Sequence, residues 1–177
     1  MVFAYDSEVA LQAAVELVNS AEDDPDSLAT VADLDAFFVR WGYTGRHERT
    51  RAELEAVRAL RPRIREVLTA ERDAAVGLVN EMLTGVTLRP QLVRHDEYDW
   101  HLHAVDYDDS LPDRIVIETA MAMIDVIRAD ENSRFSVCAD QGCEGVVLDL
   151  SRNRSKRYCS TTCGNRNAVA AYRARQG

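Results

Sequence analysis

The sequence predicts an α+β protein: a mostly helical N-terminal domain with a small antiparallel hairpin, residues 1–134, followed by a smaller hairpin-plus-helix module, residues 135–177. Apolar residues recur at helical spacing through most of the first part, and the period changes to two between Val86 and Asp106. All four cysteines lie in the second part. With 46% hydrophobic and 29% charged residues, the composition excludes a wholly disordered or fibrous chain.

The net charge of −9 is unevenly distributed along the chain. Residues 1–134 carry a net charge of −13 and residues 135–177 a net charge of +4, with seven basic residues and no acid from Leu150 onward. This pattern predicts an acidic body with a basic appendage. No apolar run approaches the ~18 residues of a membrane span, and the N-terminus lacks a basic lead before an apolar stretch. We therefore expect a cytoplasmic protein with no membrane contact.

Capping residues and apolar stripes predict the first helices. A helix from about Ser7 to Asn19 has Ser7 as a possible N-cap. Thr30 and Asp33 form a capping-box pattern at the start of the next helix, which ends at Gly42.

The same capping pattern recurs at Thr50 and Glu53, ahead of an apolar stripe that runs to Leu68. Pro62 must kink this helix or restart it as a first-turn proline. One more helix follows and closes at Gly85.

The change of period predicts two strands, residues 87–94 and 100–106, around a polar turn from His95 to Asp99. A last long helix opens at Ser110 and continues past Ile124 to Ile127. A two-stranded ribbon is marginal alone, so we expect it to pack against the helices.

His101 and His103 lie two residues apart and face the same side of the second strand. They could form half of a metal site with His95, or simply a polar face opposite Trp100. Because no carboxylate or cysteine stands nearby at ligand spacing, the polar face is favoured. The chain has no glycine-rich phosphate loop and no Gly-x-Ser-x-Gly elbow, so we expect it not to be an enzyme.

The four cysteines form two close pairs, Cys138-x4-Cys143 and Cys159-x3-Cys163, separated by fifteen residues. This arrangement is typical of a tetrahedral zinc site. Two disulfides or redox pairs are the alternative, but neither pair is Cys-x-x-Cys and the chain looks cytoplasmic. We therefore expect one structural Zn ion, because four thiolates leave no open position for catalysis.

The chain around these pairs predicts a hairpin between Val146–Leu148 and Lys156–Tyr158, with a basic tip, and a helix from Gly164 to Arg175. Cysteines at a knuckle and at a helix N-terminus, joined by a hairpin, make a treble-clef-like zinc finger. About 43 residues with few large apolar side chains need the metal in order to fold. Chelation is therefore expected to unfold residues 135–177 while the body stays folded.

The run Cys163-Gly164-Asn165-Arg166 resembles the motif of the CGNR zinc fingers, as does its context from Asp149 to Ser160. The body resembles the ABATE domain that usually precedes this finger: Leu17-Val18-Asn19-Ser20 is similar to its opening motif, and Ser27–Thr30 with Trp41-Gly42 to its next stretch. The family often has large aromatics where this chain has Val147 and Leu148. The resemblance implies a stress-induced bacterial transcription regulator.

Such a regulator would bind DNA through its finger, and the alternative is an interaction finger that docks on an acidic protein partner. Arg166 is either a DNA contact or a support for the zinc site, since four thiolates on zinc carry a formal charge of −2. The candidate DNA contacts are seven basic residues and one asparagine of the finger: Arg152, Arg154, Lys156, Arg157, Asn165, Arg166, Arg173 and Arg175.

A regulator also needs an input, and a cavity between the hairpin and the helices is the expected place for an unknown small-molecule effector. Trp41, Trp100, His101 and His103 are the candidate ligand-binding residues, together with Asn19 from the opening motif. Two fingers in a homodimer would raise the avidity for DNA, so a homodimer is a possible assembly.

Overall fold

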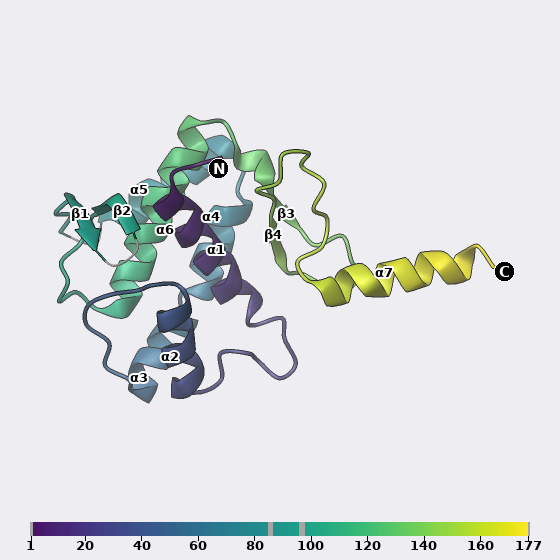
Figure 1. The fold of residues 1–177 in the computed structure, drawn as a ribbon, viewed down its shortest axis with the longest axis horizontal. Coiled ribbons are helices and arrows are strands. Elements are labelled where there is room, and N and C mark those ends of the chain that lie inside the picture. Colours follow the sequence, from purple (N-terminus) through teal and green to yellow (C-terminus); the bar gives the residue numbers. More distant parts are fainter. Residues whose placement is uncertain (1, 85–86, 96–97, 177) are drawn as a thin grey trace.

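The computed structural model describes residues 2–84, 87–95 and 98–176 and confirms a mostly helical α+β fold with two small antiparallel hairpins (Figure 1). The helices are α1 (Tyr5–Asn19), α2 (Val31–Arg40), α3 (Arg51–Arg58), α4 (Arg61–Thr69), α5 (Arg72–Thr84), α6 (Leu111–Arg128) and α7 (Thr161–Ala174), with a 3-10 turn at Asn132–Arg134. The strands are β1 (Gln91–His95), β2 (Tyr98–His103), β3 (Phe135–Val137) and β4 (Val146–Leu148).

Helices α1 and α6 pack against each other at the centre of the core, with α4 and α5 beside them and α3 against α6. Their facing side chains include Leu11, Leu17, Ile115 and Met123, all fully buried. Strand β4 packs against α1 and α4, and Phe135, Val146 and Leu148 belong to this same core. The finger's hairpin therefore shares its apolar packing with the N-terminal helices.

The helix starts follow the predicted capping residues with two exceptions. Thr30 and Asp33 form the complete capping box of α2, and Pro62 lies in the first turn of α4, so the helix restarts there. Ser7 is not a cap: α1 begins at Tyr5, and the buried Ser7 hydroxyl donates to Asp125 Oδ2 at 2.5 Å. The predicted terminator Gly85 lies outside the described residues.

The second exception is Glu53, whose capping box with Thr50 is only half formed. The Thr50 side chain accepts from the Glu53 backbone N–H, as expected for an N-cap. The buried Glu53 carboxylate reaches past Thr50, however, and accepts from the backbone N–H groups of Glu48 and Arg49. It also pairs with His47, so a tertiary partner has replaced the local one.

Strands β1 and β2 pair in antiparallel register, with Leu92 opposite Leu102 and Val93 opposite His101. The hairpin is shorter at its open end than expected, and its strands continue into the predicted polar turn up to the pair His95 and Tyr98. The centre of that turn, residues 96–97, lies outside the described residues.

The predicted pairing of the second hairpin is wrong. Strand β4 pairs with β3, and Lys156–Tyr158 is not a strand. The buried carboxylate of Asp149 accepts from the N–H groups of Ser151 and Lys156 and so closes a loop here instead of a ladder. Pairing with β3 is favoured because it carries Phe135 into the core.

Helix α7 projects away from the rest of the molecule and ends at the C-terminus (Figure 1). Every described residue from Ala168 onward is exposed, including Val169 (48% exposed) and Tyr172 (59%). These two side chains therefore do not pack the helix on the finger's hairpin. Within the described residues, no helix combines the length and apolar character that crossing a membrane requires.

Candidate zinc centre, basic surface and effector cavity

The four cysteine sulfurs converge on one point. All four Sγ atoms lie within 4.8 Å of one another, with 3.5 Å between Cys143 and Cys159 and 3.8 Å between Cys159 and Cys163. Four sulfurs about 2.3 Å from a central zinc ion lie about 3.8 Å apart, whereas a disulfide needs about 2.0 Å. The cysteines are unbridged, and their spacing fits tetrahedral zinc.

The chain supplies these sulfurs from two turns. Cys138 and Cys143 flank the turn between β3 and β4, and Cys163 lies in the first turn of α7, whose N-cap Ser160 accepts from the Cys163 N–H. Backbone N–H groups donate to sulfur at both turns, from Gly145 to Cys143 and from Cys159 to Cys138, each at 3.4 Å. Such bonds stabilise thiolates around a metal.

The thiols titrate unequally. Burial raises the pKa of the Cys138 thiol, but N–H groups of Cys159 and Asp140 outweigh it and hold that pKa below the ordinary value. Burial and the neighbouring sulfurs raise the pKa of Cys159 far above its usual range. The pKa of Cys163 is also raised, because burial and the Asp140 and Cys143 side chains oppose the lowering effect of Ser160. Packed sulfurs discourage one another's ionisation, so a central cation is what would keep all four as thiolates.

A glycine makes room for this cluster. A Cβ on the buried Gly145 would lie 2.8 Å from Cys159 Sγ and 3.4 Å from Asn19 Oδ1. Only glycine lets the backbone pass between the sulfur and the end of α1.

The Asp140 carboxylate supports the cluster from within its first turn, which sequence reasoning missed. Its side chain is 4% exposed and accepts from Arg166 Nη1 at 2.6 Å and from Asn167 Nδ2 at 2.5 Å. Asn167 also donates to the Cys163 carbonyl at 3.0 Å. Arg166 thus ties α7 to the Cys138 turn, in line with the supporting role considered for it. Its partner lies 26 residues away, beyond the reach of a spacing argument.

The structure divides the other predicted DNA contacts into two groups. Arg154 adopts a positive φ of 48° and binds Glu131 at 2.6 Å and Ser133 at 2.8 Å, so it anchors the loop. The remaining residues are exposed, and within the described part of the chain the cations among them form no ion pair: Arg152, Lys156, Arg157, Asn165, Arg173 and Arg175.

Asn19, the ligand-binding candidate from the opening motif, is not among the residues that line the two cavities described below. Its side-chain amide is engaged by the backbone of Val146 on β4. The end of α1 is therefore joined to the strand that follows the first cysteine pair.

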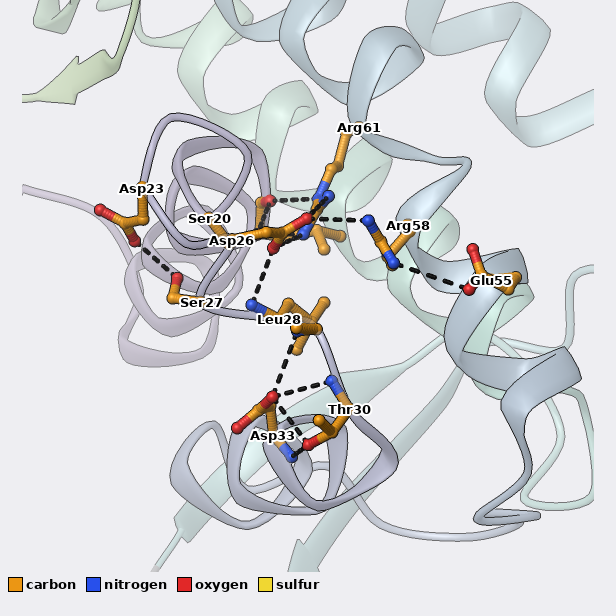
Figure 2. A network of polar contacts seen from close by, with 12 residues as sticks. Ser20, Asp23, Asp26, Ser27, Leu28, Thr30, Asp33, Glu55, Arg58 and Arg61 are labelled. Carbon is orange, nitrogen blue, oxygen red and sulfur yellow. Dashed lines mark hydrogen bonds and ion pairs between the residues drawn. The ribbon is translucent and has the colours of Figure 1, made fainter.

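The rest of the motif around Asn19 holds the chain between α1 and α2 (Figure 2). The buried Arg61 side chain binds both Asp26 oxygens at 2.8 Å, Ser20 Oγ at 2.7 Å and the Leu17 carbonyl at 3.2 Å. Arg58 adds a bond to Asp26 at 3.0 Å. In this chain, the motif that resembles the family's opening serves to fix this loop on α4.

A cavity of about 290 Å³ lies where expected, between β2, α1, α6 and the loop after α2. Of the predicted residues, Trp41, His101 and His103 line it, with Nε2 atoms of the two histidines 3.0 Å apart. Trp100 does not line it and is 62% exposed. Alternation along β2 places Trp100 on the side opposite the two histidines, although Leu102 on that same side still reaches the cavity. A second hollow of about 440 Å³ shares Thr44 and His103 with the first.

The fold and the cysteine cluster define a zinc-finger protein built on a helical domain. A family model described as "Putative stress-induced transcription regulator" (ABATE) matches residues 11–130, and a model described as "CGNR zinc finger" matches residues 134–176. The chain belongs to the ABATE family and carries a CGNR zinc finger. No curated protein is similar enough to be matched with it.

Proposed function

We propose that this protein is a DNA-binding transcription regulator, in which the finger contacts DNA and the N-terminal domain senses a small molecule. The observation that carries the proposal is a group of exposed cations in the finger, free of ion pairs within the described residues. Three lie on the loop before Cys159 and two at the far end of α7: Arg152, Lys156, Arg157, Arg173 and Arg175. Such cations suit phosphate contact. With four thiolates the zinc site is closed, which favours a structural, non-catalytic role.

Helix α7 supports DNA over the alternative of an acidic protein partner. Its 14 residues span about 21 Å, and small side chains at Ala168, Ala170 and Ala171 would let it approach a groove closely. The major groove of DNA admits one α-helix, and the exposed Asn165 is of the type that reads adenine.

Helix α1 offers a physical link between sensing and DNA binding. Its first half lines the cavity through Asp6, Ser7 and Ala10, and its last residue, Asn19, binds β4. A ligand that shifts α1 would therefore move the strand that positions the first cysteine pair.

Two alanine variants test the DNA proposal. Arg173→Ala should keep zinc and thermal stability, weaken all DNA sequences alike and reduce the salt slope of binding by about one. Arg166→Ala should release zinc faster, because Asp140 loses its cation. The exposed Arg63→Ala on α4 is the matched control. If Arg173→Ala leaves affinity and salt slope unchanged, docking on an acidic partner becomes the better account.

A further inference from the structure

The cavity between α1, α6 and β2 has walls of two kinds. Its apolar walls come from small and medium side chains of α1 and α6, among them Ala10, Ala13 and Met121, and from the Trp41 indole. Its polar walls include three carboxylates and one guanidinium, with two histidines and three hydroxyl side chains. We propose that this cavity binds an organic cation, a protonated or quaternary amine on an apolar, aromatic body. This inference rests on the proposed sensing function and names the chemical class of its effector.

Three carboxylates line the cavity, from Asp6 in the first turn of α1 and from Glu118 and Asp125 on α6. Glu118 and Asp125 are seven residues apart and so lie on one side of their helix. Arg128 is the single guanidinium among the lining residues that the structure describes. When Glu118 is ionised, three carboxylates face one guanidinium, and this excess of negative charge favours a cation and disfavours an anion.

The Glu118 carboxylate is the acceptor left for the ligand. Asp125 already accepts from Ser7 at 2.5 Å and Asp6 from the Leu102 N–H at 3.4 Å, whereas Glu118 accepts no hydrogen bond within the described residues. Arg114, one turn earlier, directs its guanidinium to the carbonyls of Asp109 and Arg46 instead. Burial raises the pKa of Glu118 to about 7 despite that guanidinium, and a bound cation would favour its ionised form.

Trp41 adds an aromatic surface of the kind that binds cations. Its buried Nε1–H has no hydrogen-bond partner within the described residues, and as a donor it favours an acceptor on the body of the ligand, not the cationic group itself. The hydrogen bond between His101 and His103 requires one Nε2 to accept, so the pair carries at most one positive charge. A metal ion fits less well, because the described metal-binding atoms gather closely only at the four cysteines.

Calorimetry on the full-length, zinc-loaded protein with three matched probes tests the proposal. Tryptamine is a cation at neutral pH, tryptophol replaces its ammonium by a hydroxyl, and indole-3-acetate is an anion of similar size. We expect tryptamine to bind at least about tenfold more tightly than tryptophol, and indole-3-acetate not to bind. Glu118→Gln should bring the two dissociation constants together, while the exposed Glu81→Gln on α5 should leave their ratio unchanged.

Any one of four results would overturn the proposal: equal binding of the probes, preference for the anion, no tryptamine binding up to about 1 mM, or an unchanged ratio of dissociation constants in Glu118→Gln. If Glu118→Gln does not fold, Asp6→Asn at the half-buried start of α1 is the test variant. Its preference for tryptamine over tryptophol should be smaller than that of the unchanged protein. DNA binding is measured separately on the same preparation. Tryptamine binding without DNA binding would refute the proposed regulator and keep the cation site; the reverse would refute the cation site alone.

Discussion

Asn19 binds Val146 through both of that residue's backbone groups. Its Nδ2 donates to the Val146 carbonyl at 2.8 Å, and its Oδ1 accepts from the Val146 N–H at 2.6 Å. A side-chain amide used in this way replaces a neighbouring strand. Because Val146 follows Cys143 by three residues, the end of α1 sets the position of the first cysteine pair.

Asn19→Ala should lower the free energy of unfolding by about 1–3 kcal/mol, since it leaves two backbone groups of Val146 without partners. Urea unfolding measures this loss, and zinc content should stay at one ion per chain. Asn153→Ala, on the exposed loop, is the control and should change little. Equal stabilities of the two variants would show that the hydrogen bonds between Asn19 and Val146 contribute nothing to folding stability.

Gly145→Ala should speed zinc release to a competing chelator, because the added Cβ would lie 2.8 Å from Cys159 Sγ. Gly77→Ala on α5 provides the matched control: its Cβ meets nothing within 4 Å, and a helix-interior alanine should add about 0.5–1 kcal/mol of stability. Because β4 packs in the main core, we now expect zinc loss to disturb α1 as well, in contrast to the expectation from sequence that the body stays folded. Unchanged release from Gly145→Ala would mean that the cluster tolerates the displacement.

Arg61→Ala should cost about 1.5–3 kcal/mol of folding stability, because Asp26 then loses the guanidinium that binds both its oxygens and keeps only Arg58 (Figure 2). That hydrogen-bonded guanidinium is also the main cause that holds the pKa of Asp26 below its ordinary value. Arg63→Ala, two residues along α4 and exposed, should stay within about 0.5 kcal/mol of the natural chain. Thermal and chemical unfolding compare the two variants. A similar small effect for both would show that the contacts between Arg61 and Asp26 do not stabilise the fold.

Glu118 should make the protein less stable as pH rises. Burial raises its pKa to about 7 in the folded chain from an ordinary value of 4.5, although Arg114 opposes the rise. Between these values the folded state holds one more proton than the unfolded state, so stability falls as pH increases and levels off above about 7. The fall due to this group is up to about 3 kcal/mol. Glu118→Gln should abolish it, whereas Glu81→Gln should retain it; parallel stability curves for all three proteins would contradict a raised pKa at Glu118.

Local features of this fold could be predicted from sequence, and the long-range ones could not. Thr30, Pro62 and Ser110 act within one helical turn, and the cysteine spacing alone indicates the zinc cluster. The partner of β4 is selected by which strand buries Phe135, a property of the whole core.

The candidate sites show the same limit. Asp140 lies between Cys138 and Cys143 in the sequence, but the spacing of the residues does not predict that Arg166 binds it. Trp100 is different, because the two-residue alternation that groups His101 with His103 already turns it to the other side of the strand. That signal separates Trp100 from the two histidines, but it does not by itself exclude Trp100 from the cavity, because Leu102 on the same side lines it.

The salt dependence of DNA binding by the full-length, zinc-loaded protein tests the central claim most directly. If the five exposed cations of the finger, Arg152, Lys156, Arg157, Arg173 and Arg175, all contact phosphates, the logarithm of the affinity should fall with the logarithm of the salt concentration with a slope of about −4 to −5. Chelation should abolish binding. A slope near zero, binding that survives zinc removal, or no binding at low salt would contradict a DNA-contacting finger.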